Sequence, residues 1–119
     1  MLQVIMLQIL MYILFWRKID NMVKKVIQLI LCHLIGDYFL QIKYIAETKG
    51  KNWYHLFVHC ALYCIPFIYF WGYEVQIIYI FVSHFIIDLI KSRYKKIIDV
   101  QDQSLHYVTL ALIEMISPL

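Results

Sequence analysis

Four segments of the chain each carry two polar residues spaced four positions apart, and every pair contains at least one histidine. The pairs are His33/Asp37, His55/His59, His84/Asp88 and Asp102/His106. Residues four apart lie on the same face of an α-helix. Imidazole and carboxylate groups are ligands for zinc, manganese and iron. The spacing therefore predicts helices that each turn two candidate metal ligands in one direction.

The segments around these pairs are strongly apolar. Of the 119 residues, 63% are hydrophobic and 16% are charged, and the charged share lies below the ~25% of ordinary soluble domains. Apolar runs long enough to cross a bilayer alternate with short charged clusters. We therefore predict an all-α protein, a polytopic transmembrane bundle in the cell inner membrane. Cys32, Cys60 and Cys64 lie within these runs, and we interpret them as small buried hydrophobes.

The elements that position the pairs are four expected core helices. They cover Val26 to about Ala46, Trp53 to Trp71, Val75 to about Lys91, and Asp102 to Ser117. Pro66 lies inside the second, and Gly72 marks a tight turn after it. Residues 1–21 are expected to add a short apolar N-terminal helix, interfacial or dispensable, because Met22 is a plausible start for a four-helix domain over 22–119.

Basic residues gather in the connections after the first and third core helices. Seven of them lie there: Lys43, Lys49, Lys51, Lys91, Arg93, Lys95 and Lys96. Such clusters mark cytoplasmic loops and attract anionic lipid headgroups. We expect the bilayer and its anionic headgroups as partners, and a homo-oligomer stays open. Nucleic acid is not expected, because no basic stripe of a folded soluble module is visible.

The polar pairs are expected to lie at similar depths. Counting ~1.5 Å per residue from the basic side puts Asp37 roughly 13 Å, His59 about 9 Å and His84 about 10 Å into the bilayer. Asp102 and His106 open the fourth helix at that same side. A carboxylate at the centre of a membrane helix costs about 2.5–3.5 kcal/mol unless it is compensated. The pairs are therefore predicted to converge on one site.

Roles can be proposed for these residues. The expected metal ligands are His33, Asp37, His59, His84, Asp88, Asp102 and His106. Asp37 and Asp88 are also candidate general bases, and Lys91 is a candidate group for steadying negative charge. An Asp one turn from a His can instead orient the imidazole, and Lys91 can instead extend toward the interface. Interhelical hydrogen bonding alone is the simplest alternative for the pairs.

Five motifs carry a resemblance to a known family. They are HLIGDYFLQ at 33–41, KGK at 49–51, HCALY at 59–63, HFIIDLIK at 84–91 and DQSLH at 102–106. In this order they resemble the domain-of-unknown-function family 3307 of bacteria and phages, over roughly residues 24–115. The resemblance implies a small helical membrane protein, and it implies no particular activity. It marks as family positions His33, Asp37, Gln41, His59, Tyr63, His84, Asp88, Lys91, Asp102 and His106. His55 lies outside the motifs and is interpreted as an interfacial residue.

Three functions fit these observations. The first is a membrane hydrolase that uses a divalent metal ion (zinc, manganese or iron) and acts on a lipid or polyprenyl phosphoester at the headgroup layer. The second is a channel or carrier for protons or metal ions, since Asp and His form relays in transporters. The third is a non-enzymatic membrane partner or effector whose polar cluster only specifies helix pairing.

Overall fold

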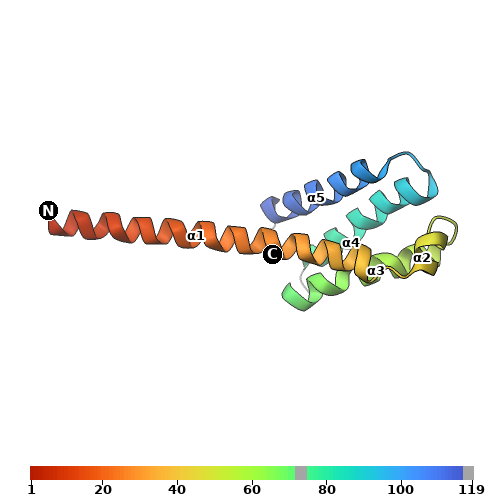
Figure 1. The fold of residues 1–119 in the computed structure, drawn as a ribbon, viewed down its shortest axis with the longest axis horizontal. Coiled ribbons are helices and arrows are strands. Elements are labelled where there is room, and N and C mark those ends of the chain that lie inside the picture. Colours follow the sequence, from red (N-terminus) through yellow and green to blue (C-terminus); the bar gives the residue numbers. More distant parts are fainter. Residues whose placement is uncertain (72–74, 117–119) are drawn as a thin grey trace.

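The chain folds into helices, and its computed structural model describes residues 1–71 and 75–116 (Figure 1). The elements in order are α1 (Leu2–Leu34), η1 (Ile35–Phe39), α2 (Lys43–Thr48), α3 (Trp53–Trp71), α4 (Val75–Asp88), η2 (Leu89–Arg93) and α5 (Asp99–Ile116). No strand occurs in these two ranges, so the predicted all-α class is confirmed. Gly72, Ser117 and Pro118 lie outside the described residues.

The bundle consists of the second half of α1 together with α3, α4 and α5. Helix α4 packs against both α3 and α5, and α1 lies against α3 and α5. The described apolar core runs through the bundle and comprises Leu29, Cys32, Tyr63, Cys64, Phe67, Ile80 and Leu110. Cys32, Cys60 and Cys64 are buried and free, as expected for small hydrophobes. Helix α3 continues through Pro66.

Three helical stretches are long and apolar enough to cross a membrane. They are Leu2–Phe39, Trp53–Trp71 and Val75–Arg93. Helix α5, which we expected as a fourth span, is not among them, although it packs into the bundle. Its first turns carry Asp99, Asp102 and Gln103, and this polar start lowers its mean hydropathy.

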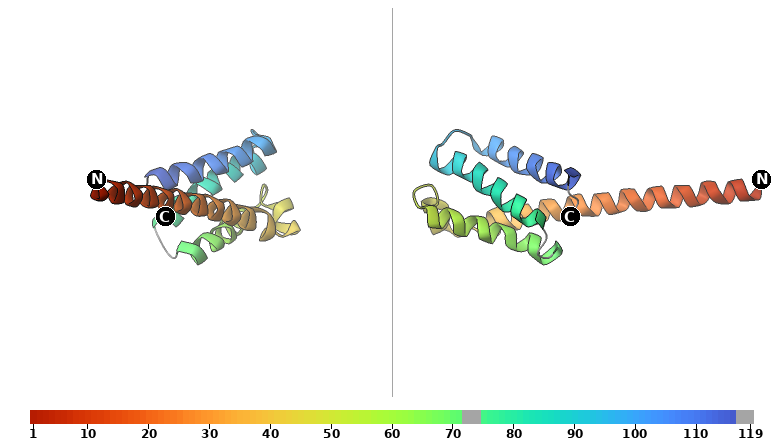
Figure 2. Two further views of the ribbon diagram at one scale, coloured as in Figure 1. Left: turned by 60° about the vertical axis from the view of Figure 1, so that its left-hand side comes forward. Right: turned by 180° about the vertical axis from the view of Figure 1, so that it is seen from behind.

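The N-terminal apolar stretch is helical, but it does not form a separate short helix. It continues without a break into the first core helix as α1, and its side chains are exposed along residues 1–17. Figures 1 and 2 show this half of α1 projecting from the bundle. The bundle and the projecting helix together are 70 Å long. No helix-breaking residue stands between Trp16 and Met22, so nothing in the local sequence ends the helix there.

The first core helix ends earlier than expected, at Phe39 rather than near Ala46. Its last turn, η1, is π-helical, with the Leu40 amide donating to the Ile35 carbonyl at 2.9 Å. Ile42 is extended, and the chain then continues into α2, which lies beside the start of α3 at the end opposite the N-terminus (Figure 1). This path brings the residues after α2 to the end of the bundle.

A second π-helical turn, η2, ends the helix that begins with α4. The Tyr94 amide donates to the Leu89 carbonyl at 3.3 Å, again five residues apart. The connections that follow η1 and η2 lie at the same end of the molecule, opposite the N-terminus (Figure 1). Gly50, in the connection after α2, lies against Ser92 of η2, and an added Cβ there would collide with the Ser92 carbonyl oxygen. The seven basic residues therefore gather at one end of the bundle.

Candidate metal centre

The predicted stripes converge inside the bundle. Each helix contributes: α1 and η1 supply His33 and Asp37, α3 supplies His59, α4 supplies His84 and Asp88, and α5 supplies Asp102 and His106. All seven residues are buried, none with more than 6% of its surface exposed. The i,i+4 spacing accounts for this arrangement, since each pair occupies the inward face of its own helix.

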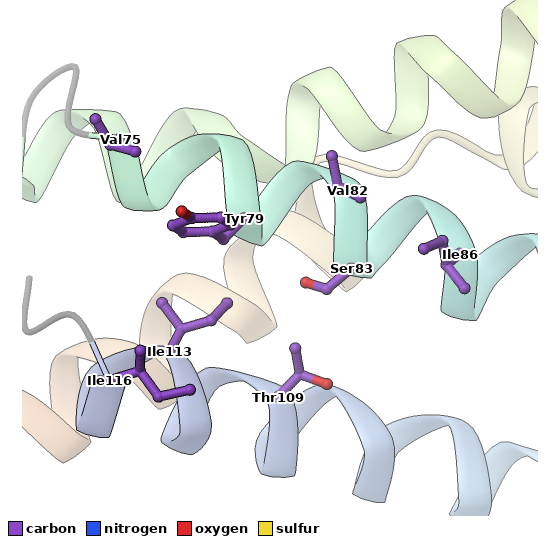
Figure 3. A pocket seen from close by; sticks show the side chains of 8 residues that line it. All are labelled: Val75, Tyr79, Val82, Ser83, Ile86, Thr109, Ile113 and Ile116. Atoms are coloured by element: carbon purple, nitrogen blue, oxygen red, sulfur yellow. The ribbon is translucent and has the colours of Figure 1, made fainter.

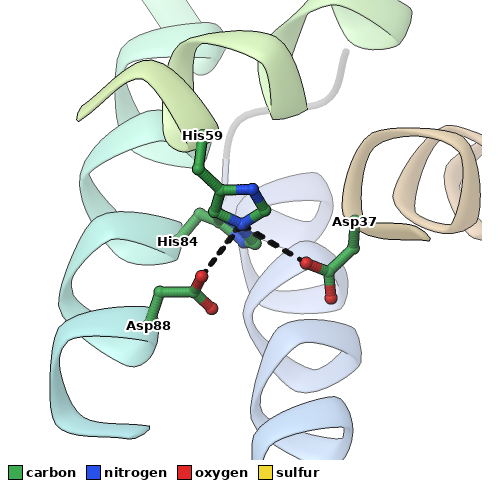
Figure 4. Close-up of side chains that lie close together, drawn as sticks. All are labelled: Asp37, His59, His84 and Asp88. Atoms are coloured by element: carbon green, nitrogen blue, oxygen red, sulfur yellow. Dashed lines mark hydrogen bonds and ion pairs between the residues drawn. The ribbon is translucent and has the colours of Figure 1, made fainter. Parts of the chain in front are cut away.

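Four of these residues form the tightest group, shown in Figure 4. The His59 Nε2 atom lies 2.9 Å from Asp88 Oδ2 and 3.4 Å from Asp37 Oδ1. The His84 Nε2 atom lies 3.0 Å from His59 Nε2 and 3.9 Å from each of the same two carboxylates. One ligand atom from each residue lies within 4.8 Å of all the others.

These separations come close to those between the ligand atoms of a metal ion. Bonds of ~2.0–2.2 Å to a tetrahedral ion place its ligand atoms about 3.3–3.6 Å apart. The five distances above, from 2.9 to 3.9 Å, bracket that range. Two imidazoles and two carboxylates could therefore hold a metal ion with small side-chain adjustments.

A second group shares one member with the first. Asp37, Asp102 and His106 also offer ligand atoms within 4.8 Å of one another. The two groups are linked through histidines as well, because the Nδ1 atoms of His84 and His106 lie 3.2 Å apart. The His84 ring is also stacked on Tyr63, with ring centroids 3.6 Å apart and planes 5° from parallel, which holds its orientation.

His33 lies in the cluster, but both of its ring nitrogens have protein partners. The Tyr63 hydroxyl is 2.8 Å from Nδ1, and the Gln103 Oε1 atom is 2.8 Å from Nε2. An amide oxygen only accepts hydrogen bonds, so Nε2 carries the proton and donates to it, and the hydroxyl donates to Nδ1. The Gln103 amide nitrogen then donates to Asp37 Oδ2 at 3.1 Å. In this arrangement His33 positions Asp37 through Gln103.

Two lysines reach the buried carboxylates. The Lys49 Nζ atom lies 2.5 Å from Asp88 Oδ2. Lys91, the candidate group for steadying negative charge, lies 3.0 Å from Asp102 Oδ2 and 2.9 Å from the exposed Asp99. Lys91 therefore contacts the second group, while Asp37 and Asp88 meet in the first.

Both lysines also line an open pocket at the basic end of the bundle. Its lining residues are Gln41, Ala46, Glu47, Lys49, Gly50, Lys51, Lys91, Ser92 and Lys95. Gln41 lies here rather than beside Asp37, because η1 ends the helix between them. Four lysine ammonium groups in one pocket favour the binding of an anion. Two of them, from Lys49 and Lys91, also contact the buried carboxylates of Asp88 and Asp102.

Sequence reasoning missed two residues of the site, Lys49 and Gln103. Each falls inside a family motif, next to Gly50 and Asp102 respectively. Their place in these motifs was the one indication in the sequence that they belong to the site. His55 lies outside the cluster, as its position outside the motifs suggested. Its Nδ1 atom lies 2.6 Å from Thr48 Oγ1, so it joins α2 to α3.

An apolar groove between α4 and α5 is separate from the cluster (Figure 3). It is lined by Val75, Tyr79, Val82, Ser83, Ile86, Thr109, Ile113 and Ile116. None of these side chains is a carboxylate or an imidazole. The groove therefore offers no metal ligands of the kinds present in the cluster.

The fold and the site together define a helical protein with membrane-type helices and a buried His/Asp cluster. The chain belongs to the family described as Protein of unknown function (DUF3307), whose model matches residues 25–118. The match confirms the resemblance and leaves most of the projecting half of α1 outside it. No curated protein and no solved structure matched the chain.

Proposed function

We propose that this protein is a multi-pass membrane hydrolase that uses a divalent metal ion to cleave a phosphoester of a membrane lipid. The observation that carries the proposal is the meeting of Asp37, His59, His84 and Asp88 at separations close to those between the ligand atoms of a metal ion. We further propose that the protein lies in the cell inner membrane with its basic end at the cytoplasmic surface.

The donor set supports zinc, manganese or iron as the ion. Imidazole suits zinc and iron, and carboxylates extend the range to manganese. A cation at this point would also offset the charge of two carboxylates held in an apolar bundle. Lys49 offsets part of that charge through Asp88, so the ion and the ammonium would share one carboxylate.

The basic pocket supports a phosphate-bearing substrate. Lys49 and Lys91 line the pocket and also contact Asp88 and Asp102, so an anion held there would lie beside the metal ligands. Residues of the basic connections line this pocket, and those connections lie at one end of the bundle (Figure 1). At a membrane surface, anionic headgroups concentrate near such lysines.

The proposed reaction is hydrolysis by water. Asp37, His59, His84 and Asp88 would hold the divalent ion, which would supply Lewis acidity toward a phosphoryl oxygen and toward water. The water oxygen forms a bond to phosphorus while the bond from phosphorus to the lipid alcohol oxygen breaks. Asp88 or Asp37 takes the water proton, and the alcohol oxygen takes a proton from solvent at the pocket mouth. Lys91 would stabilise the negative charge that develops on phosphate.

Transport is less well supported by the same residues. A channel needs a polar path to both ends of the bundle. Beyond the cluster, the described core continues with Cys64, Phe67 and Ile80, all buried and apolar. This packing opposes a water-filled route through a single copy of the chain.

Metal content and hydrolysis test the proposal together. The detergent-purified chain is expected to retain about one or more zinc, manganese or iron ions per molecule and to release phosphate from a lipid phosphomonoester. His84→Ala should abolish both, while His55→Ala, outside the cluster, should keep both. A folded wild-type protein that binds no metal would overturn the proposal. Ion flux in proteoliposomes without hydrolysis would favour a carrier instead.

A further inference from the structure

Asp37 directs its two oxygens toward different neighbours. Its Oδ1 atom faces His59 at 3.4 Å and His84 at 3.9 Å. Its Oδ2 atom accepts from the Gln103 amide at 3.1 Å. Asp37 is also the residue common to both groups of candidate ligands. A carboxylate placed in this way can bridge two ions.

The second group contains buried atoms that lack hydrogen bonds. Asp102 Oδ1 and His106 Nε2 have no hydrogen-bond partner in the described structure, although they lie 3.3 Å apart at ion-pair distance and His106 Nε2 also lies 3.5 Å from Asp88 Oδ1. Asp102 is 1% exposed and His106 is 2% exposed. Buried polar atoms are nearly always satisfied in folded proteins, and an exception points to an absent ion or water.

The other oxygen of Asp102 is fully engaged. Lys91 donates to Asp102 Oδ2 at 3.0 Å, and the Gln103 amide donates to the same atom at 3.1 Å. These two contacts fix the carboxylate and leave Oδ1 turned toward His106. The i,i+4 pair on α5 thus presents one oxygen and one nitrogen to the same point.

We propose that the site is dinuclear, with a second divalent cation bound by Asp37, Asp102 and His106 and with Asp37 bridging the two ions. Neutral imidazoles bound through Nε2 both carry their proton on Nδ1, so the rings of His84 and His106 must turn away from their 3.2 Å Nδ1 contact when the second ion binds. The inference rests on the proposed function, because the first ion is the one held by His59, His84 and Asp88. Two-metal sites with ions about 3.5–4 Å apart are suited to phosphoester hydrolysis, since they stabilise both the attacking and the leaving oxygen.

The charge of the cluster indicates when the second ion binds. Three carboxylates (Asp37, Asp88 and Asp102) face two ammonium groups (Lys49 and Lys91), which leaves one net negative charge when the imidazoles are neutral. One divalent ion makes the site singly positive, and a second makes it triply positive. An anion in the basic pocket would offset this excess, so inorganic phosphate should strengthen binding of the second ion.

Manganese titration of the full-length protein in detergent tests the inference. We expect two Mn²⁺ per chain, with the weaker site tightened at least several-fold by inorganic phosphate. Because a shared carboxylate couples the electron spins of two manganese ions, electron paramagnetic resonance should show a coupled pair. Asp102→Asn should retain one uncoupled ion, and His106→Gln should do the same if the first variant fails to fold. Asp99→Asn is the matched control, since Asp99 also pairs with Lys91 but is exposed, and it should keep two ions.

The outcomes separate this inference from the proposed function. One ion in the wild-type chain and one in Asp102→Asn would overturn the dinuclear site and leave a mononuclear hydrolase standing. Two uncoupled ions would overturn the Asp37 bridge. Two ions retained in both α5 variants would overturn the assignment of Asp102 and His106. A folded chain without any ion would overturn both proposals.

Discussion

Lys49 and Asp88 form a buried ion pair, 2.5 Å between Nζ and Oδ2, across 39 positions of the chain. The same carboxylate oxygen lies 2.9 Å from His59 Nε2. This oxygen therefore contacts both a lysine of the basic pocket and a histidine of the candidate ligand set. The ion pair links the pocket to the candidate metal centre.

Removing the Lys49 ammonium should destabilise the protein mainly when metal is absent. In Lys49→Met, Asp88 loses its partner, and breaking a buried pair costs about 3–5 kcal/mol. A bound metal ion should recover more than half of this loss, because it supplies the missing positive charge. Thermal unfolding in detergent with and without added metal measures the difference.

Lys51 provides the control for this prediction. It lines the same pocket but is exposed, so Lys51→Met should change the free energy of unfolding by no more than ~0.5 kcal/mol. An equal loss for Lys49→Met in metal-free and metal-loaded protein would contradict the idea that ammonium and metal share Asp88.

The Tyr63 hydroxyl should matter for stability and not for the number of ions bound. Tyr63→Phe leaves the buried His33 Nδ1 atom without its donor, at a cost of about 1–3 kcal/mol. The stacking of the ring on His84 is kept, so metal content should be unchanged. Tyr69→Phe, at a side chain that is 83% exposed, should alter neither quantity. Loss of metal in Tyr63→Phe would show that the hydroxyl belongs to the binding site.

Gly36 permits the close approach of η1 to α3. An added Cβ there would lie 2.7 Å from the Tyr63 carbonyl oxygen and 2.9 Å from Tyr63 Cδ2. Because backbone cannot move aside cheaply, Gly36→Ala should cost about 1–3 kcal/mol and weaken metal binding by displacing Asp37. Ala61→Ser, which adds one atom at an exposed position of α3, is the control. An unchanged unfolding midpoint for Gly36→Ala would mean that the two helices can separate without loss.

The first twenty-one residues should be dispensable for the site. Their side chains are almost all exposed, and the family match begins only at residue 25. A chain that starts at Met22 should keep the helicity of its remaining residues, its unfolding midpoint and its metal content within error. Circular dichroism and elemental analysis of the two purified forms measure this. A truncated chain that no longer binds metal would assign the projecting helix a role in building the bundle.

The ligand cluster was accessible to sequence reasoning because it follows from helix periodicity. His84 and Asp88 had to share a face wherever α4 was helical, and the depth count predicted that the pairs would meet. The candidate ligands within single helices therefore follow from the spacing alone. The all-α class followed from the apolar runs in the same way.

The features of the site that the sequence did not predict depend on how the connections fold and how the helices pack. Lys49 reaches Asp88 only because the helix ends at Phe39, and nothing in the residues near Leu40 marks that end. Gln103 gains its role from the approach of α5 to α1, a long-range contact that spacing does not encode. The π-helical turns η1 and η2 likewise left no sequence pattern that we recognised.

These two wide turns have a consequence for tolerance to deletion. Each accommodates one more residue per turn than an α-helix does. Removing a single residue from η1 would let ordinary helical winding resume, and the chain would leave the helix in nearly the same direction, because five residues of a π-turn and four of an α-turn cover similar rotations. Removing one residue from the regular winding of α3 between His59 and Tyr63 would instead turn everything downstream by about 100° around the helix axis. Loss of the exposed Ala61 should therefore harm this centre more than loss of Phe39.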